Sequence, residues 1–409
     1  MIQYILFVLI IFILIFFAYI KLKYPFWNNI PVFHTYDYFR YFYSKPYIMY
    51  KYPIKTKFLD LHQINTYNIL DITNEQNNEF LNLLQCYYIP TENITHNISL
   101  SELNSYFIGC YEPCYISFHY PKKINTDNSQ ILINYTTNFN ACITSRPFNF
   151  YIRSQLTDSI YDKHNIYFID YICSQRNEIK QNINRKLLQT HLYNQSVLNP
   201  SINISIIKKD FELLEGVVPF VSYFTYTYHL SKIKIVELPD HYYIESINET
   251  NFHLLIDFLN NINNQTNTSY FDTFIFSDVT NIMSLIKNKI LYIYCLKKKK
   301  SIYGFYFFKN TNTLYDHIEG SSVQLIASII NCSSLIIFYK GFINSLYTFK
   351  KINKEHKILL IDDINHNQFI LNFWNQNNHS VFSNKSAYYL INYIYPPSPL
   401  LKERCFILI

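Results

Sequence analysis

Two of the eight cysteines have a spacing that could bind a metal ion. Cys110 and Cys114 form a C-x3-C pair, but no second pair follows to complete a zinc-finger pattern. The pair therefore fits either a zinc site or two separate buried thiols. The sequence contains no nucleophile elbow and no obvious Ser-His-Asp or Cys-His set, so no side chain stands out as a nucleophile.

The glycines are spread too thinly to form a phosphate-binding loop. The chain has five of them, Gly109, Gly216, Gly304, Gly320 and Gly341, and no two lie within ten residues of each other. Loops that cradle phosphate need clustered glycines, because the backbone has to approach the phosphate oxygens. The spacing argues against Walker-type NTPases, kinases with a glycine-rich loop and dinucleotide-binding folds.

The positive charge is dispersed as well. The formal net charge is +6, and the densest basic run, Lys297–Lys300, lies between two aromatic stretches. Alternating aromatic stretches on both sides favour a hairpin with a solvated turn, and a nucleic-acid or lipid patch is the alternative. The chain has no arginine-rich stripe, so we expect no nucleic-acid partner.

The first 23 residues contain a long apolar run. Residues 5–20 carry no charge, and together with residues 2–4 they approach the ~20 residues that a bilayer-spanning helix needs. A secretory signal would need a basic start and a small-residue cleavage site. Because Lys21 and Lys23 follow the run, we expect a single-pass transmembrane anchor over residues 1–23, with the catalytic part facing the cytosol. A buried core helix is the alternative.

Helix signals occur in both halves of the chain. Thr73 and Gln76 form a capping box, followed by an apolar face at helical spacing. A second segment, starting at Ile244, has the same plan. The two apolar faces are Phe80, Leu83, Leu84 and Tyr87, and Phe252, Leu255, Ile256 and Leu259.

Strand-like aromatic runs and further helices follow each of these segments. The further helices are predicted at residues 182–195, 321–331 and 365–376. The order helix, strands, helix, found twice, predicts two similar α/β halves packed as one body. The dominance of Asn, Ile, Tyr, Lys and Phe indicates an A/T-rich coding sequence, as in a large DNA virus or a protist.

Several short motifs, in their order and spacing, resemble those of eukaryotic-type N-myristoyltransferases. Residues 25–32, "PFWNNIPV", are similar to the family's Lys-Phe-Trp-x-x-Gln-Pro-Val stretch. Residues 169–173, "IDYIC", are similar to its core strand Ile-Asn-Phe-Leu-Cys. The other matches lie at residues 67–72, 143–147, 216–219 and 360–393, so the resemblance covers about residues 24 to 409.

The resemblance implies an α/β fold of the duplicated acetyltransferase-like (GNAT) type, with a bent mixed sheet flanked by helices. Residues 24–210 would be the acyl-CoA-binding half, and residues 211–409 the peptide-binding half. The implied reaction moves a tetradecanoyl group from coenzyme A to the N-terminal glycine amine of a peptide or protein. Myristoyl-CoA would be a co-substrate, no cofactor is implied, and we expect a monomer.

The resemblance also implies the catalytic residues. The backbone N–H groups of Tyr171 and Ile172 would stabilise the oxyanion, and the terminal carboxylate of Ile409 would be the base. Asp170 replaces the family's asparagine, which helps to hold the amine. A carboxylate could still accept that hydrogen bond, and could assist as a base.

The acyl-CoA site is implied by two segments. Phe26, Trp27 and Asn28 would lie along the acyl-CoA, or would form an interfacial aromatic belt beside the anchor. Cys173 would pack beside it. Residues Lys180, Gln181, Asn182 and Ile183 stand where the family has a basic loop that binds the CoA phosphates, and a helix N-terminus can itself hold phosphate.

Some positions depart from the family. Leu214 stands where the family has a threonine, and Phe382-Ser383-Asn384 replaces its Gly-Asp-Gly. These departures leave a second hypothesis open, a catalytically inactive, membrane-bound homologue that binds an acyl chain or peptide. A chance match in an unrelated tethered domain is a third.

Overall fold

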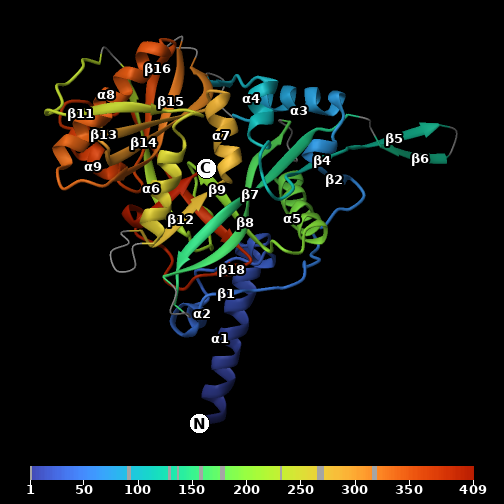
Figure 1. Cartoon of the computed structure of the whole chain (residues 1–409). Helices are drawn as coiled ribbons and strands as arrows, with labels where there is room; N and C mark the ends of the chain where they lie inside the picture. The colour runs from blue at the N-terminus through green and yellow to red at the C-terminus, as the bar shows by residue number, and fades with distance from the viewer. Residues whose placement is uncertain are drawn as a thin grey trace.

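A computed structural model describes residues 2–89, 94–127, 130–135, 138–155, 160–175, 180–230, 233–264, 271–315 and 320–409. This part of the chain forms a large mixed sheet flanked by helices (Figure 1), so the predicted mixed α/β class is confirmed. The helices are α1 (Ile2–Lys23), α2 (Tyr38–Tyr43), α3 (Asn74–Tyr87), α4 (Leu100–Ser105), α5 (Lys180–Leu198), α6 (His253–Asn264), α7 (Val279–Lys287), α8 (Leu335–Ile352) and α9 (Asn367–Trp374), with 3-10 turns η1 (Trp27–Asn29), η2 (Ile69–Asp71) and η3 (Lys402–Arg404).

In the described residues the strands form one sheet of 15 strands and two two-stranded sheets, β1–β18 and β5–β6. The large sheet runs β11-β13-β14-β15-β16-β10-β17-β9-β8-β7-β12-β19; in addition β4 pairs with β7 and β2, and β3 pairs with β14. The strands are β1 (Tyr47–Ile48), β2 (Ile64–Asn68), β3 (Ile94–His96), β4 (Tyr115–His119), β5 (Lys122–Asp127), β6 (Gln130–Tyr135), β7 (Ala141–Arg153), β8 (Tyr161–Ser174), β9 (Ile204–Asp210), β10 (Val221–His229), β11 (Tyr242–Ile247), β12 (Thr273–Phe276), β13 (Leu291–Lys298), β14 (Ser301–Tyr315), β15 (Gly320–Ile330), β16 (His356–Asp362), β17 (Phe382–Ile391), β18 (Tyr393–Ile394) and β19 (Cys405–Leu408).

The same strand–helix–strand unit occurs twice in the sheet. β8 and β9 pair in parallel and are joined by α5, and β15 and β16 pair in parallel and are joined by α8. Each unit is followed by a strand that pairs with the other unit, because β10 lies beside β16 and β17 lies beside β9. β10 and β17 also pair with each other. Exchanged strands therefore join the two units into one continuous sheet.

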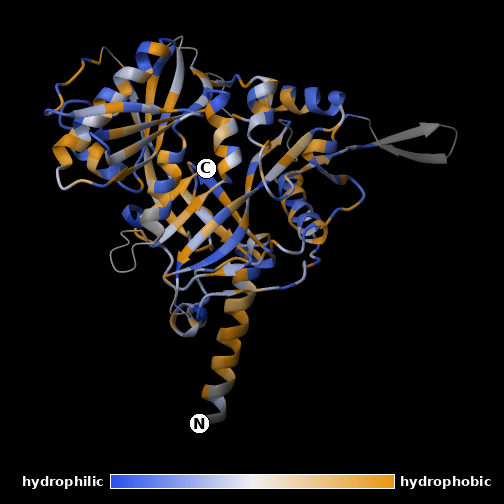
Figure 2. Ribbon diagram, in the orientation of Figure 1, coloured by the Kyte–Doolittle hydropathy of each residue, from blue (hydrophilic) through white to orange (hydrophobic). Residues whose placement is uncertain are grey.

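Helix α8 shows how aromatic side chains hold the layers together. Its buried face packs against β13 and β14 and recurs every three or four residues, with Phe338, Phe342, Leu346 and Phe349. Each such side chain contributes about 1.5–3 kcal/mol when it is fully buried. Gly341 on the same face allows close approach, and Tyr306 Oη donates to the Phe338 carbonyl at 2.6 Å. Figure 2 shows hydrophobic residues along the central strands as well.

Three sequence predictions of local structure are confirmed. Thr73 Oγ1 accepts from Gln76 N–H at 3.2 Å, and Gln76 Oε1 accepts from Thr73 N–H at 3.0 Å, so the capping box forms at the start of α3. The basic run forms the tip of the β13–β14 hairpin, as expected: Lys297 and Lys298 end β13, and Lys299 and Lys300 form the turn. Helices α5 and α9 occupy the segments predicted at 182–195 and 365–376.

Two helix predictions were wrong or too long. Residues 321–331 form strand β15, which lies between β14 and β16 and is almost wholly buried. A strand covered on both faces has a continuous apolar pattern, so periodicity could not separate it from a buried helix. The segment starting at Ile244 begins as strand β11, and its helix α6 starts only at His253.

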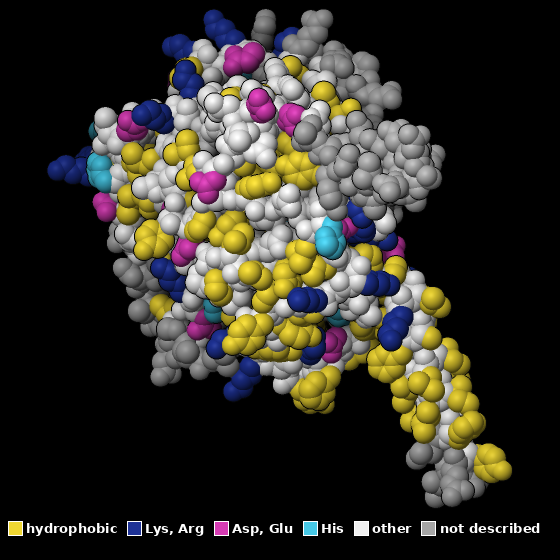
Figure 3. All heavy atoms as spheres, turned by 90° about the vertical axis from the view of Figure 1, so that its right-hand side faces the viewer, with side chains coloured by type: hydrophobic (Ala, Val, Ile, Leu, Met, Phe, Trp, Pro, Cys, Tyr) yellow, Lys and Arg dark blue, Asp and Glu magenta, His cyan; other side chains and the backbone are white. Residues whose placement is uncertain are grey.

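The predicted transmembrane anchor is also corrected. Helix α1 projects from the body in Figure 1, and Figure 3 shows apolar side chains around it. Within the described residues, however, no helix has the length and apolar character required to cross a bilayer. The predictions of a single-pass membrane protein and of a catalytic part that faces the cytosol were therefore wrong, and the described residues do not show a membrane partner.

Candidate active site

A cavity of about 1140 Å³ lies where β8 and β9 separate. Their parallel pairing ends at Ile169 and Ile207, and beyond this point the two strands are no longer partners. Residues of β14, β16 and β17 contribute to the wall as well. The predicted site residues that line this cavity are Phe26, Trp27, Asp170, Tyr171, Ile172, Cys173 and Ile409.

Strand β8 carries a bulge inside the cavity. Cys173 pairs with Cys142 of β7 and Asp170 pairs with Thr144, so Tyr171 and Ile172 together face the single residue Ile143. An extra residue in one strand interrupts the ladder and re-aims the backbone groups at that point. The bulge therefore presents the segment Tyr171–Ile172 without a ladder partner in β7.

Surrounding contacts hold the bulge in an uncommon conformation. Tyr171 has φ +47°, in the left-handed region that non-glycine residues seldom adopt. Such a conformation costs about 1–3 kcal/mol and persists only when the neighbours fix it. The Tyr171 ring is 5% exposed and packs against four other rings, and Thr144 Oγ1 donates to the Asp170 carbonyl at 3.1 Å. The four rings are those of Phe80, Tyr88, His96 and Tyr106.

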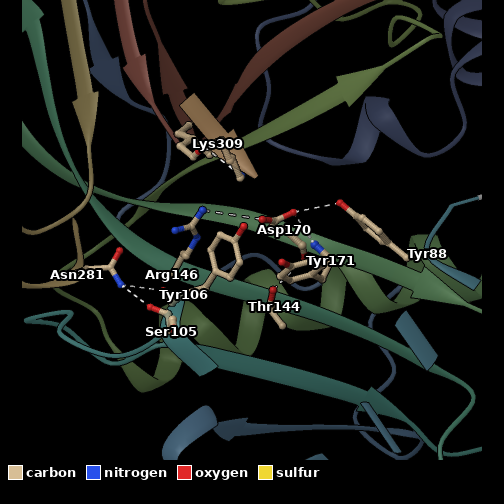
Figure 4. Close-up of polar contacts among 10 residues, drawn as sticks. Tyr88, Ser105, Tyr106, Thr144, Arg146, Asp170, Tyr171, Asn281 and Lys309 are labelled. Carbon is tan, nitrogen blue, oxygen red and sulfur yellow. Dashed lines mark hydrogen bonds and ion pairs between the residues drawn. The ribbon is translucent and has the colours of Figure 1, made fainter. Parts of the chain in front are cut away.

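The side chain of Asp170 lies between three polar groups. Its Oδ1 accepts from Tyr171 N–H at 2.9 Å and from Tyr88 Oη at 3.5 Å. Its Oδ2 is 4.0 Å from Nη2 of Arg146. Figure 4 shows Arg146 and Tyr88 approaching Asp170 from opposite sides. One of the two predicted oxyanion donors is thus engaged with a neighbouring carboxylate.

The C-terminal strand brings Ile409 to the cavity. β19 pairs in parallel with β12, and its residues Phe406 and Leu408 are buried in the core. Lys309 of β14 donates from Nζ to the carbonyl oxygen of Ile409 at 3.3 Å. Burial lowers the pKa of Lys309 to about 8, and repulsion from Arg146 acts in the same direction. At neutral pH the Lys309 amine is therefore still mostly protonated.

A second charged cluster lines the cavity at the ends of β9 and β16. Lys208 and Asp210 form an ion pair at 3.2 Å. Asp362 Oδ1 accepts from Thr225 Oγ1 at 2.6 Å and its Oδ2 accepts from Gln324 Nε2 at 2.8 Å. Burial raises the pKa of Asp362, partly offset by the Lys208 ammonium. This wall of the cavity is polar and preorganised.

The predicted acyl-CoA residues are only partly brought together. Phe26 and Trp27 contact each other at the cavity wall, and the Arg185 guanidinium lies 6.0 Å from the Phe26 ring. Asn28 does not line the cavity among the described residues; its Oδ1 accepts from Tyr36 Oη at 2.9 Å instead.

The remaining predicted residues of this site are spread over α5 and β8. Lys180 and Gln181 begin α5, but their side chains lie outside the described part of the structure. Asn182 is exposed, and Ile183 packs on the cluster that contains Phe26. Cys173 Sγ donates to the Leu83 carbonyl at 3.4 Å, in keeping with the packing expected of it.

Sequence reasoning missed several charged residues of the cavity region. Lys208, Asp210 and Asp362 lie at or near the end of a strand after an apolar stretch, and that position was the available signal; Lys309 follows an apolar stretch in the middle of β14. Arg146 is 1% exposed in the middle of β7, where nothing in the sequence sets it apart. His96 was missed too; burial lowers its pKa to about 4, so its imidazole is neutral.

The paired cysteines Cys110 and Cys114 do not line the cavity. Cys114 is buried and its Sγ donates to the Phe107 carbonyl at 3.7 Å, while Cys110 is half-buried. Over the described ranges, no three or more His, Cys, Asp or Glu side chains gather as metal ligands would. A hydrogen bond between the two thiols lowers the pKa of Cys110 and raises that of Cys114.

Comparison with solved structures reveals extensive similarity in fold. Two structures of Saccharomyces cerevisiae N-myristoyltransferase with bound myristoyl-CoA match with TM-scores of 0.66 and 0.67, each at 11% sequence identity. The first match covers 94% of this chain and 99% of the yeast chain, and the second covers 95% and 94%. A third, with myristoyl-CoA and inhibitors, has a TM-score of 0.66 at 11% identity and covers 96% and 98%.

No protein-family profile and no curated protein sequence matches the chain. The similarity therefore lies in the fold. The chain folds as the yeast enzyme does, which confirms the predicted likeness to N-myristoyltransferases at the level of architecture.

Proposed function

We propose that this chain, which has the fold of N-myristoyltransferases, is an acyltransferase that moves a tetradecanoyl group from coenzyme A to an N-terminal glycine amine. The yeast structures of the same fold contain bound myristoyl-CoA. The cavity where β8 and β9 separate is large enough for a substrate of that kind. The fold alone does not imply the reaction, so the proposal rests on the residues of the cavity.

One observation carries the proposal: the bulge at Tyr171–Ile172 and the last residue of the sequence, Ile409, line the same cavity. A thioester carbonyl placed at the bulge would have backbone N–H groups at its oxygen. Preorganised donors of this kind stabilise the oxyanion, and loss of one typically costs about 3 kcal/mol. Because the donors belong to the backbone, Tyr and Ile can serve in place of other side chains.

The attacking amine has to lose a proton before it reacts. An N-terminal ammonium has a pKa near ~8, so a base in the site is needed at neutral pH. The Ile409 carboxylate takes that proton, and the neutral amine then attacks the thioester carbonyl. The C–N bond forms, the C–S bond breaks, and the departing CoA thiolate takes the second amine proton.

Lys309 positions the base in this scheme. Its Nζ donates to Ile409 at 3.3 Å, and it is the neighbour that fixes the terminal oxygen on the cavity wall. Asp170 lines the same cavity as Lys309 and Ile409 and stays a candidate partner for the substrate amine. Phe26, Trp27 and Cys173 form the acyl-CoA side of the cavity, with the start of α5 nearby.

The two strand–helix–strand units suggest that each half of the chain binds a different substrate. We assign acyl-CoA to residues 24–210, which contain β8, β9 and α5, and the peptide mainly to residues 211–409. The repeated topology is what a duplicated acetyltransferase-like ancestor would leave behind. The polar cluster of Lys208, Asp210 and Asp362 then lies where the two substrates approach each other.

The test is a transfer assay with the full chain. Myristoyl-CoA and a peptide with an N-terminal glycine are incubated with the protein, and released CoA thiol and the mass of the peptide are followed. We expect equal amounts of free thiol and acylated peptide. The matched control peptide begins with N-acetylglycine and should gain no acyl group. Thiol release without acylated peptide would contradict the proposal.

A second candidate is a non-catalytic protein that binds an acyl chain or peptide. The hydrogen bond between Tyr171 N–H and Asp170 favours it, because a carboxylate there competes with the oxyanion. Such a protein would be stabilised by acyl-CoA in a thermal-shift assay, yet would release no CoA thiol in the presence of peptide.

A further inference from the structure

We infer that Asp170 and Arg146 together control access to the Tyr171 donor. Asp170 accepts the Tyr171 N–H in this structure, and Arg146 receives the carboxylate when a substrate carbonyl oxygen takes that N–H. Arg146 is thus a positioning residue that clears the oxyanion site. The inference rests on the proposed acyl transfer and adds to it a step that precedes the chemistry.

The first observation is that two acceptors compete for the Tyr171 N–H, the Asp170 carboxylate and the substrate carbonyl oxygen. Tyr171 N–H donates to Asp170 Oδ1 at 2.9 Å, a full hydrogen bond to a charged acceptor. A carbonyl oxygen bound at the bulge would need the same proton. If the carboxylate stayed, its negative charge would also face the developing oxyanion at close range, and like charges at a few ångström destabilise each other strongly in a cavity.

The second observation is that Arg146 has unused donors. Its side chain is buried, and its Nε, Nη1 and Nη2 have no hydrogen-bond partner among the described residues. Three aromatic rings surround the guanidinium at 4.9 to 5.5 Å, those of Phe148, Tyr106 and Phe168. A guanidinium stays charged at any physiological pH, so a carboxylate is the partner that its buried donors lack.

The third observation is that Asp170 can reach Arg146 by moving its side chain alone. Oδ2 and Nη2 are 4.0 Å apart, about one ångström beyond a charge-assisted hydrogen bond. The Asp170 side chain is 18% exposed and lines the cavity, so it has room to rotate. Its backbone is held by Thr144, whose Oγ1 donates to the Asp170 carbonyl. Figure 4 shows Arg146 on the side away from Tyr88.

The kinetic test is a double-mutant cycle between Arg146→Met and Asp170→Ala. We expect Arg146→Met to lower kcat about 100-fold, the loss typical of one oxyanion donor, with KM for acyl-CoA changed less than about threefold. In the Asp170→Ala background no carboxylate has to be withdrawn, so the same substitution should lower kcat less than about threefold. Melting curves establish that all four proteins are folded at the assay temperature.

The matched control is Arg153→Met. Arg153 lies on the same strand and pairs with Asp272 at 3.0 Å, outside the cavity. It should leave kcat within about twofold. The inference is overturned if Arg146→Met keeps the wild-type kcat, or if it lowers kcat equally with and without Asp170.

A second measurement does not depend on turnover. A ketone analogue of myristoyl-CoA, with a methylene in place of the thioester sulfur and a 13C-labelled carbonyl, is bound to each variant. We expect infrared difference spectra to give a lower carbonyl frequency in the wild type than in Arg146→Met. The low frequency should return in the double variant. An unchanged frequency in Arg146→Met would overturn the inference.

The two measurements separate the inference from the proposed function. If the wild type transfers no acyl group but binds the ketone with the expected frequencies, acyl transfer fails and the role of Arg146 stands. If peptide is acylated while Arg146→Met behaves as the wild type, the inference alone fails. If the ketone does not bind in a titration by calorimetry, both fail.

Discussion

Two cations lie over the ring of Tyr106, and each has an oxygen-bearing partner. The Arg146 guanidinium lies 5.0 Å and the Lys309 ammonium 5.3 Å from the centre of that ring. Arg146 faces Asp170, and Lys309 faces Ile409. Two buried cations at such close range repel each other, and the two oxygen-bearing partners offset that repulsion. Loss of either partner would leave an uncompensated charge in the core.

The buried Lys309 predicts a specific pH dependence of stability. Its pKa is about 8 in the folded protein, below the ordinary 10.5, so between these values the unfolded chain holds a proton that the folded chain lacks. The contribution of Lys309 to the free energy of unfolding should therefore rise with pH across this window, by about 3 kcal/mol in total, against an opposing contribution from buried thiols whose pKa burial raises. Urea unfolding between pH 7.5 and 10.5 measures this rise, which Lys309→Met should remove.

The matched control for this prediction is Lys299→Met, in the exposed turn between β13 and β14. At pH 7.5 it should change the free energy of unfolding by less than about 0.5 kcal/mol. A stability profile of Lys309→Met that runs parallel to the wild type across the window would show that Lys309 is not the group responsible.

At the scale of residues, the sequence predicted the site residues that belong to a recognisable motif. It did not predict the charged residues that only the tertiary structure brings to the cavity. The bulge residues and Ile409 follow from short matches in order and do meet in one cavity. Arg146 and Lys309 lie in aromatic strands, where a single basic residue is usually a solvated edge position. Only the packing of β7 against β8 reveals that Arg146 is buried, and only the contact with Ile409 reveals that the half-buried Lys309 faces the cavity.

At the scale of elements, the close contact between α8 and the sheet depends on Gly341. A Cβ at this position would collide with Tyr306 Oη, which donates to the Phe338 carbonyl. We expect Gly341→Ala to lower the free energy of unfolding by about 1–3 kcal/mol, because the packed helix cannot withdraw from the strand without losing its aromatic contacts. Chemical denaturation measures the change.

Two companion variants sharpen this test. Tyr306→Phe removes the oxygen that the new methyl group would meet, so Gly341→Ala should cost less in that background. Ser345→Ala, one turn further along α8, should cost about 1 kcal/mol or less, as expected for one hydroxyl that donates to the Gly341 carbonyl. Equal losses for Gly341→Ala in both backgrounds would contradict the steric explanation.

The capping box of α3 gives a second prediction at this scale. Thr73→Ala leaves the N–H of Gln76 without its side-chain acceptor and should lower the free energy of unfolding by about 1 kcal/mol. Thr73→Ser keeps the hydroxyl and should stay close to the wild type. Thermal unfolding of the two variants provides the comparison, and similar losses in both would exclude the cap as the cause.

Elements with a local signal were predictable, whereas buried central strands were not. Thr73 and Gln76 define the start of α3 within four residues of each other, without help from the rest of the chain. Residues 321–331 look helical because Val323, Leu325 and Ile329 lie in a nearly continuous apolar run. The true helix of that region, α8, is itself apolar on a wide face and was overlooked beside it.

On the scale of the whole molecule, residues of both halves line the cavity, and Ile409 is one of them. Addition of one glycine after Ile409 moves the carboxylate away from Lys309, so we expect kcat for acyl transfer to fall at least about 100-fold. The dissociation constant for acyl-CoA should change less than about threefold, because that side of the cavity is untouched. Transfer assays and calorimetry measure the two quantities.

The matched control is a single glycine added before Met1, at the far end of α1 in Figure 1. It should leave both quantities unchanged. A C-terminally extended protein that keeps full kcat would rule out the Ile409 carboxylate as the base, and would direct attention to Asp170.

Overall architecture was predictable from the order of short motifs, because they place the same strands and helices along the chain as in proteins of this fold. The exchange of β10 and β17 between the units depends on pairing between residues far apart in the chain, such as His229 with Ile358 and Asp210 with Ser386, and no local pattern encodes it. The prediction of a transmembrane anchor over residues 1–23 was also based on local composition alone, and local composition does not determine what surrounds a helix.

The exchanged strands have a consequence for attempts to divide the protein at residue 210. In a fragment that stops there, β9 would lack its partner β17. The unpaired backbone N–H and C=O groups of β9 would form an exposed edge strand that is prone to aggregation. The complementary fragment, residues 211–409, contains both β10 and β17 and would keep their pairing. It would lose β9, so one edge of β17 would be unpaired. Mixing both pieces should then restore a soluble complex by strand pairing, as in a split reporter.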